Sequence, residues 1–425
     1  MREEEVYERV ASEYRPRVID DRVSVLLAAF GGLLIAGPKW CGKSWTGIHH
    51  SKSVFFVGDE DSAALAALDP SLALDGEQPR LIDEWQDVPK LWDIARRNVD
   101  LSGKKGAYLF TGSTIPPQKR TLHSGTGRFA RIRMRPLSLF ESGDSSGSVS
   151  ISSLFSGNDI KNTKSDMDYR KIVGLICRGG WPASVGMDEQ TALEIPLMYI
   201  ESVIDSDLYR LDGKERDKTL LKLVLESLAR NNATSAKLSV ISNDISENGG
   251  KVSDSTILDY VNAYKRIYVI EEQKAWTTSL RSRSRIRTSS KKHFTDPSLA
   301  AAVLGATPNI LVRDVRTAGL LFESLCYRDL CVYASALKGS VYHYRDNTDL
   351  EVDDIIELSD GRWGAIEVKL GTSEFDKAAK NLLALKKKVD NGKAPSFLMI
   401  LSASGGLAYT REDGVLVVPV DLLGP

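Results

Sequence analysis

Cysteine, histidine and long apolar runs are scarce in this chain. Its 425 residues include 4 Cys and 5 His, the cysteines form no CxxC pair, and the histidines show no zinc-ligand spacing. These absences exclude a disulfide scaffold and argue against a structural zinc site. The longest apolar stretch, residues 25–36, is interrupted by glycines and is too short to span a bilayer. We therefore expect a cytoplasmic protein with no membrane partner.

An excess of charge of one sign is also missing from the chain as a whole. Lys and Arg number 56 against 57 Asp and Glu, a net charge of -1, so no overall field favours a nucleic acid or a membrane. The charges are nevertheless segregated. Residues 96–135 hold ten Lys or Arg and one acid, whereas residues 346–360 hold seven acids and no Lys or Arg. Each window is either a solvated face or part of a functional site.

Short apolar segments alternate with helix-length segments over about the first 140 residues. This alternation predicts a parallel sheet with helices on its faces. A Ser/Gly/Asp-rich stretch follows at residues 142–153 and is expected to be a loop or linker. The expected helices are residues 3–13 and 20–30, and the expected strands are residues 32–36, 54–57, 80–82 and 107–111.

The rest of the chain begins with helical periodicity and ends with a second alternating pattern. Helices followed by a strand pair suggest a winged helix, and the later order of elements predicts a second α/β domain. The expected helices of the first part are residues 169–178, 191–208, 214–230, 236–243 and 253–264, and its strand pair lies within residues 267–275 and 285–294. The second part is expected to hold helices at 317–334 and 374–390 and strands at 341–344, 350–358, 363–369, 396–401 and 415–419.

One motif in the first domain carries a specific chemistry. Residues 37–44, Gly-Pro-Lys-Trp-Cys-Gly-Lys-Ser, match GxxxxGK[ST] between a predicted strand and a predicted helical run. Backbone N–H groups of such a loop surround a phosphate. Lys43 is expected to contact the β and γ phosphates of ATP, and Ser44 to offer its hydroxyl to Mg²⁺. The predicted nucleotide-binding residues are Gly37, Pro38, Lys39, Trp40, Cys41, Gly42, Lys43, Ser44 and Trp45.

Further polar residues follow the next predicted strands. Asp83 fits the carboxylate on the Mg²⁺ side, and Glu84 is placed to polarise the attacking water. Ser113, favoured over Thr111, is the candidate sensor of the γ-phosphate. Arg128 lies on a glycine-flanked turn and is either an arginine finger for a neighbouring subunit or an ordinary surface arginine.

These segments together resemble the AAA+ P-loop ATPases of a widespread bacterial and archaeal family whose members carry a C-terminal domain of unknown function. The resemblance implies ATP binding with Mg²⁺, ATP hydrolysis, and a C-terminal half built from a winged helix and a nuclease-like region, without a defined biological task. It is carried by residues 37–44, 81–86, 109–113, 127–128 and 135–138, and further along by residues 179–182, 207–208 and 319–323.

An acidic constellation near the C-terminus resembles the PD-(D/E)xK restriction-endonuclease core. Glu367 and Lys369 are two apart on a predicted strand and therefore share a face, where Asp353 of the paired strand can meet them. Glu323, on the preceding helix, matches the fourth position. In that core the acids hold Mg²⁺ and the lysine acts on water. The alternatives are a working or cryptic nuclease, a nuclease-derived binding domain, and coincidence.

A basic stretch precedes this region, in and just before the proposed wing. Alternation of its arginines on a strand would form a track for phosphates, with Trp276 and Phe294 as flanking aromatics. The alternative is a solvated edge strand that its charges protect from pairing. The basic residues are Arg281, Arg283, Arg285, Arg287, Lys291 and Lys292.

The sequence thus predicts an α/β protein that binds ATP and Mg²⁺. Its expected function is that of a homo-oligomeric ATPase that couples hydrolysis to a nucleic-acid or protein partner held by the C-terminal half, with DNA or RNA contacts at residues 276–294 and in the C-terminal domain. The alternatives are an ATP-gated, Mg²⁺-dependent nuclease and a non-catalytic interaction protein switched by ATP. The expected domains are an AAA+ P-loop ATPase domain (1–140), a linker and helical lid (141–210), a winged-helix-like domain (211–296) and a PD-(D/E)xK nuclease-like domain (297–425).

Overall fold

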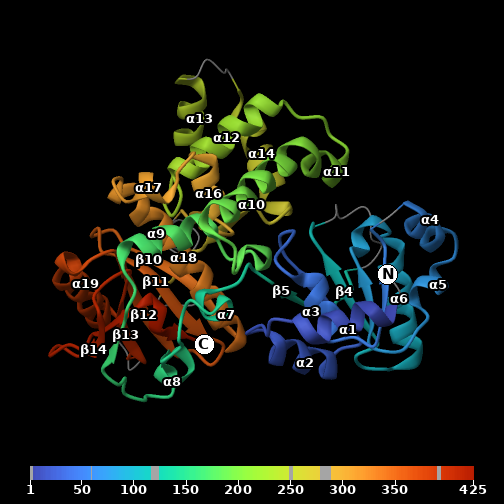
Figure 1. Ribbon diagram of the computed structural model, residues 1–425, viewed down its shortest axis with the longest axis horizontal. Helices are drawn as coiled ribbons and strands as arrows, with labels where there is room; N and C mark the ends of the chain where they lie inside the picture. The colour runs from blue at the N-terminus through green and yellow to red at the C-terminus, as the bar shows by residue number, and fades with distance from the viewer. Residues whose placement is uncertain (1–2, 59, 116–123, 248–251, 278–288, 390–393) are drawn as a thin grey trace. The chain divides into compact units, whose positions relative to one another are not determined.

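The chain forms two units in the structure, a computed structural model (Figure 1). The first unit comprises Met1–Pro136, Asp207–Lys214 and Arg266–Tyr268, and the second comprises Leu137–Ser206, Glu215–Lys265 and Val269–Pro425. None of the helices in the described part of the chain is long and apolar enough to cross a membrane. The residues that the structure describes are 3–58, 60–115, 124–247, 252–277, 289–389 and 394–425.

The first unit is built on a five-stranded parallel sheet with the strand order β2-β3-β4-β1-β5. The four strands expected from the sequence are confirmed, and β5 was not anticipated because its short Phe-Ala-Arg-Ile-Arg sequence lies in the basic window. Strand β4 separates β1 from β3. The strands are β1 (Gly32–Ala36), β2 (Ser53–Phe56), β3 (Arg80–Asp83), β4 (Tyr108–Gly112) and β5 (Phe129–Arg133).

Helices cover both faces of this sheet. Leu33 and Ile35 of β1 share a core with residues of α1, α2 and α3, whereas Leu34 points to the other face and packs with residues of α4, α5 and α6. Because both faces are buried, the strands are almost entirely apolar and polar side chains collect at their ends. The helices are α1 (Glu3–Glu13), α2 (Asp20–Ala29), α3 (Lys43–His49), α4 (Glu60–Leu68), α5 (Pro70–Leu74) and α6 (Lys90–Ser102).

The second unit contains a mixed seven-stranded sheet with the order β10-β11-β12-β13-β15-β14-β7. Helix α19 (Phe375–Lys388) shares a core with Trp363, Ala365 and Leu398, and helix α18 (Val315–Ala336) packs on β10, β11 and β12. The strands are β7 (Thr163–Lys164), β10 (Gly339–Arg345), β11 (Glu351–Leu358), β12 (Trp363–Lys369), β13 (Phe397–Ser402), β14 (Leu407–Thr410) and β15 (Leu416–Pro419).

The helical part of the second unit ends in an antiparallel hairpin, β8 (Ile270–Gln273) with β9 (Lys291–Phe294). The Ser253 hydroxyl accepts a bond from the Thr256 amide at 3.2 Å and caps the start of α14. The order of helices and hairpin is the expected one, and the winged helix itself stays a prediction. The main helices are α9 (Tyr169–Arg178), α10 (Glu189–Ser202), α12 (Lys218–Arg230), α13 (Leu238–Glu247), α14 (Asp254–Arg266) and α16 (Pro297–Val303).

The expected loop at residues 142–153 is shorter in the structure, where only residues 143–148 lie outside helices and strands. The segment includes the end of α7 (Leu139–Ser142), the short strand β6 (Val149–Ser150) and the start of α8 (Ile151–Phe155). Strand β6 pairs with β16 (Leu423–Gly424) at the end of the chain. Serines here cap helices: Ser138 and Glu141 form a capping box, and Ser150 accepts from the amide of Ser153. Serine enrichment therefore marks helix starts in this segment.

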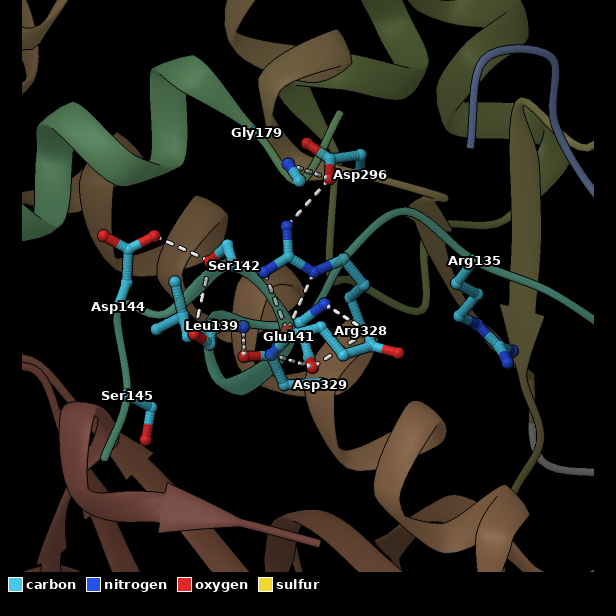
Figure 2. Close-up of polar contacts among 12 residues, drawn as sticks. Arg135, Leu139, Glu141, Ser142, Asp144, Ser145, Gly179, Asp296, Arg328 and Asp329 are labelled. Atoms are coloured by element: carbon cyan, nitrogen blue, oxygen red, sulfur yellow. Dashed lines mark hydrogen bonds and ion pairs between the residues drawn. The ribbon is translucent and has the colours of Figure 1, made fainter. Parts of the chain in front are cut away.

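A buried ionic cluster joins α18 to the segments before it in the second unit (Figure 2). Arg328 is 2% exposed, and its guanidinium lies 2.8 Å from Asp296 and 2.7 Å from Asp329. Asp329 also accepts a bond from the amide of Leu139 at 2.9 Å. Burial raises the pKa of Asp329 to about 6 despite the charge of Arg328. The cluster therefore depends on Arg328 to compensate two buried carboxylates.

The Gly-Gly-Trp-Pro segment that carried part of the family resemblance packs onto this cluster. The Gly180 amide donates to Asp296 at 2.9 Å, and a Cβ at Gly180 would lie 2.1 Å from the carbonyl oxygen of Leu137. The Trp181 indole donates to Ser298 at 2.9 Å. These residues therefore have a structural role in the core of the second unit.

Replacing Arg328 by leucine should destabilise the second unit by about 3–5 kcal/mol, because Asp296 and Asp329 would be left buried and unpaired. The matched control is Arg170→Leu, since Arg170 pairs with Glu189 on the surface at 2.7 Å and such pairs contribute about 1 kcal/mol or less. Urea unfolding of both variants checks this. Equal losses for the two variants would contradict the assigned role of Arg328.

Candidate nucleotide and acidic sites

The GxxxxGKS loop runs from the end of β1 to the start of α3. A Cβ at Gly37 would lie 2.2 Å from the carbonyl oxygen of Met134, so only glycine fits beside the neighbouring backbone. Gly42 has a φ of +99°, a left-handed conformation that L side chains rarely adopt. Both glycines of the motif are thus required by the local geometry, and strand, loop and helix follow in the order that the sequence predicted.

The lysines of this loop are held by protein oxygens. Lys43 is 4% exposed, and its Nζ donates to the carbonyl of Pro38 at 2.7 Å. Lys39 pairs with Asp207 at 2.6 Å. Trp40 is 55% exposed, whereas the Cys41 side chain is buried in the core and offers the loop only its backbone.

Three strand ends of the first unit carry polar residues beside this loop. Because β1, β3 and β4 are parallel, their carboxyl ends meet at one edge of the sheet. The Asp83 carboxylate is hydrogen-bonded by the hydroxyls of Ser44 and Thr111. The structure therefore brings together the two residues predicted to hold Mg²⁺, Ser44 and Asp83.

Glu84 has a separate set of partners at the same edge. It accepts bonds from the Ser113 hydroxyl at 2.9 Å and from the Gln86 side chain. Burial raises the pKa of Glu84, but the charge of Lys43 and the two hydrogen bonds outweigh burial, so this pKa is lowered. Burial, followed by the nearby Glu84, raises the pKa of Asp83. The pKa values of the adjacent carboxyls are thus shifted in opposite directions, and the shift of Glu84 favours its ionised form.

Arg128 lies at the opposite edge of the sheet. Its carbonyl accepts bonds from the amides of Gly31 and Gly32, at the start of β1, whereas the P-loop follows the end of β1. The five residues of β1 separate these edges by about 16 Å. Arg128 is about half exposed and pairs with Asp100 at 2.7 Å. Within its own protomer Arg128 is not part of the nucleotide site.

Two residues near the loop were not found from the sequence as site residues. Arg17 is buried, and its guanidinium donates to the carbonyls of Cys41 and Arg135, at 2.8 Å in both cases. Asp207 reaches Lys39 from a part of the chain far away in sequence. Only the resemblance of Asp207 and Leu208 to the family offered a signal, because such contacts depend on tertiary packing.

The structure also brings Asp20, His49 and His50 within 4.8 Å of one another. No residue pattern predicted this grouping. The Asp20 carboxylate accepts bonds from the hydroxyl of Tyr14 and the amide of Arg17, both at 2.7 Å, and lies 3.1 Å from His50. Its oxygens are engaged in joining α2 to the end of α3, and we assign no metal to this cluster.

The acidic residues predicted in the C-terminal region come together in the second unit. Glu323, Asp353 and Lys369 line one pocket of about 840 Å³. Lys369 lies 3.1 Å from Asp353 and 2.6 Å from Glu367, which is buried beneath them and also accepts a bond from Asn381 at 3.0 Å. All four predicted positions therefore belong to one cluster.

The described residues that flank the predicted phosphate track differ from the expectation, whereas the four arginines of the track itself are not tested. Lys291 is 3% exposed and lies among carboxylates, so it cannot contact a polyanion in this state. Trp276 and Phe294 are buried, and Trp276 packs on Trp363 with ring centroids 4.8 Å apart. Alternation on a strand does not tell which face is covered by another element. Arg281, Arg283, Arg285 and Arg287 lie outside the described residues.

Burial and mutual repulsion dominate the electrostatics of this cluster. Burial raises the pKa of Glu323 to about 7 against the charge of Lys291, and burial together with the Asp353 charge raises the pKa of Glu367 to about 8. The pKa of Asp353 is lowered to about 2, because Lys369 and Lys291 outweigh its burial. Asp353 is thus the carboxylate that stays ionised throughout the neutral range.

Comparisons with known proteins divide the chain into three matched segments. Residues 30–142 match the family described as AAA domain, residues 169–310 match a domain of unknown function (DUF8612), and residues 318–423 match a domain of unknown function (DUF4143). No curated protein sequence matches the chain at a significant level.

Similar solved structures include three ATP-related or DNA-bound proteins. A Walker-type ATPase of Pyrococcus abyssi has 12% identity and a TM-score of 0.41, with 69% of this chain and 96% of that chain covered. AMPPCP-bound DnaA of Aquifex aeolicus has 12% identity and a TM-score of 0.27, with 58% and 86% covered. Aeropyrum pernix Orc1 in complex with DNA has 13% identity and a TM-score of 0.25, with 72% and 97% covered. Likenesses of this size assign no function.

The family match and the site geometry concern the same residues. The matched segment contains the P-loop, the Asp83–Glu84 pair and Ser113. The P-loop and the parallel sheet of the first unit thus lie within a segment that is similar to the AAA domain family.

In metal-free buffer, the free energy of unfolding should fall as pH rises from about 5 to 8. Glu323 and Glu367 have pKa values of about 7 and 8 in the folded state, so they keep their protons up to about those pH values, while the unfolded state releases them near pH 4 to 5. Each such proton contributes a slope of about 1.4 kcal/mol per pH unit. Glu367→Gln should therefore flatten the profile, as measured by urea unfolding.

The control for this profile is Asp360→Asn. Hydrogen bonds from Arg362 lower the pKa of the exposed Asp360, so it is ionised in both states above pH 5 and contributes no slope there. A profile that keeps its full slope in Glu367→Gln would contradict the raised pKa of Glu367.

Proposed function

We propose that this protein is a Mg²⁺-dependent ATPase whose nucleotide site lies at the carboxyl edge of the sheet in the first unit. The observation that carries the proposal is the convergence, at this edge, of the P-loop, the Ser44–Asp83 contact and the half-buried Glu84. The match of residues 30–142 to the AAA domain supports the same reading.

The residues of the site fit a magnesium nucleotide. A hydroxyl and a carboxylate in contact, Ser44 and Asp83, form the small oxygen set that suits Mg²⁺ when phosphates complete its coordination. Bound there, Mg²⁺ would neutralise charge on the phosphates. The backbone amides of residues 39–44 would hold the phosphates, and Lys43 would exchange the Pro38 carbonyl for a phosphate oxygen.

Glu84 is placed to orient and deprotonate the attacking water. Its carboxylate is fixed by Ser113 and Gln86, so its direction is set before a nucleotide binds. The lowered pKa keeps it ionised, as a proton acceptor must be. Ser113 thus acts on the γ-phosphate region through Glu84 in this proposal.

Two substitutions separate nucleotide binding from hydrolysis. Lys43→Ala should lose ATP affinity by at least about tenfold, because it removes the cation that faces the phosphates. Glu84→Gln should keep ATP affinity and lose turnover by about 10²–10³-fold, since an amide cannot accept the proton. Fluorescent-nucleotide titration and phosphate release measure the two effects.

The matched control is Lys52→Ala, which removes an exposed lysine that pairs with Glu77 at 3.2 Å. It should leave both affinity and turnover unchanged. The proposal fails if Lys43→Ala binds and hydrolyses ATP like the unaltered protein.

For Arg128 we propose a role in a neighbouring subunit of a homo-oligomer. Its distance from its own P-loop leaves only a site in trans, and its exposed guanidinium carries the charge that such a role needs. Arg128→Ala should bind ATP normally and lose turnover by about 10²-fold or more.

Mixing Arg128→Ala with Glu84→Gln tests the trans geometry. Mixed oligomers contain interfaces in which both altered residues fall in one site and others in which neither does, so activity should exceed the sum of the separate variants. Simple additivity, or turnover by monomers, would rule out the role in trans.

A second candidate function is an ATP-gated, Mg²⁺-dependent nuclease in the second unit. The observation that favours it is the meeting of Glu323, Asp353, Glu367 and Lys369 beside one pocket. Carboxylate oxygens are the ligands that Mg²⁺ prefers, so the donor set fits the metal. Asp353 and Glu367 would hold it and Lys369 would contact the water. A nuclease-derived module that only binds DNA, RNA or a protein is the alternative.

Cleavage assays on single- and double-stranded DNA and RNA with Mg²⁺ or Mn²⁺ test the nuclease function. Asp353→Asn should abolish cutting, because it removes the carboxylate that stays ionised, while Asp360→Asn on the exposed turn should not change it. Lack of cleavage under all conditions, or equal cleavage by Asp353→Asn, would leave a binding module.

A further inference from the structure

Lys291 reaches the acidic cluster from outside the predicted nuclease-like core. It lies on β9 of the hairpin, yet its Nζ is 2.7 Å from Glu323, 3.1 Å from Glu351 and 3.7 Å from Asp353. Its side chain is only 4% exposed. The charge of a buried ammonium is compensated by the carboxyl groups around it. Removing either the ammonium or these carboxyl groups leaves the remaining charge uncompensated.

The hairpin that carries Lys291 is anchored on both sides of the cluster. Gln273 of β8 donates to Asp354 of β11 at 2.7 Å and lies 3.1 Å from His293. His293 is 2.7 Å from Ser324 of α18 and stacks on Tyr327, with ring centroids 4.2 Å apart. The hairpin therefore fixes the position of the Lys291 ammonium, which does not belong to a freely moving surface side chain.

Two ammonium groups together form ion pairs with the carboxyl groups of the cluster. Lys291 faces Glu323, Glu351 and Asp353, while Lys369 faces Asp353 and Glu367. One further oxygen stays unpaired: Oδ2 of Asp354, which is 1% exposed, has no hydrogen-bond partner among the residues that the structure describes.

A divalent cation at this pocket would require the oxygens that Lys291 holds. Mg²⁺ and Mn²⁺ bind through ionised carboxylates, and the added charge of a nearby ammonium opposes them. Without Lys291, Glu323 and the partly exposed Glu351 would lose the cation that pairs with them, and Asp353 would keep only Lys369 of its two cations. Ammonium and metal are thus alternatives at the same carboxylates.

We infer that Lys291 is the resident cation of the acidic cluster, and that a divalent metal ion binds there only when the hairpin β8–β9 withdraws this ammonium. Hairpin position thereby controls metal loading. The inference rests on the second candidate function only in taking the carboxylate cluster as the metal site.

Calorimetric titration of the full-length, nucleotide-free protein with Mn²⁺ tests this inference. Lys291→Met should bind Mn²⁺ at least tenfold more tightly than the unaltered protein, and its thermal midpoint should drop in EDTA and recover in Mn²⁺. Lys291→Arg keeps the cation and should stay insensitive to Mn²⁺. Lys292→Met, on the same strand with its Nζ on the carbonyl of Ala236, is the matched control.

The double variant Lys291→Met/Asp353→Asn localises the effect and should lose the gained Mn²⁺ affinity. Equal affinity in the unaltered protein and Lys291→Met, or no Mn²⁺ binding to either, overturns the inference. If Lys291→Met does not fold in EDTA, refolding in Mn²⁺ is the readout: recovery supports the inference, and failure overturns it. This titration measures Mn²⁺ binding and not cleavage. If Lys291→Met gains Mn²⁺ affinity and the separate cleavage assay shows no cutting, only the nuclease function is rejected.

Discussion

Burying an ionised carboxylate away from water costs several kcal/mol unless a cation or a set of donors compensates it, and both sites of this protein are organised around that requirement. In the first unit, Lys43 and two side-chain donors favour the ionised form of the half-buried Glu84. In the second unit, Lys291 and Lys369 share the acidic cluster, and Arg328 compensates Asp296 and Asp329. The lysines of both candidate sites lie where a phosphate or a metal ion would alter their pairing.

The two sites are assembled in different ways. A parallel sheet covered on both faces leaves its functional residues at one edge, so the nucleotide site follows from topology. The acidic cluster instead combines two neighbouring strands, helix α18 and the hairpin β8–β9, and it depends on contacts between distant segments. Such a cluster responds to movement of any one of its elements, and this gives the hairpin its proposed control over metal loading.

Residue patterns predicted the first site better than the second. Local signals were enough for the P-loop, for Asp83 and Glu84 and for most strands, because glycine geometry and apolar runs act within a few residues. Strand β5, Arg17 and Asp207 were missed, since pairing and packing place them. The arginine and lysine alternation near the hairpin indicated an exposed strand, whereas the structure buries Lys291 and Trp276. A strand pattern shows which residues share a face and not what covers that face.

The central claim is that residues 37–44 hold the phosphates of a magnesium nucleotide. Hydrogen–deuterium exchange of the full chain, with and without Mg²⁺ and a non-hydrolysable ATP analogue, tests it most directly, because the backbone amides of the loop are the proposed phosphate ligands. The account predicts slower exchange of the amides of residues 39–44 when the analogue is bound. Unchanged exchange in that loop at a saturating concentration of the analogue would contradict it.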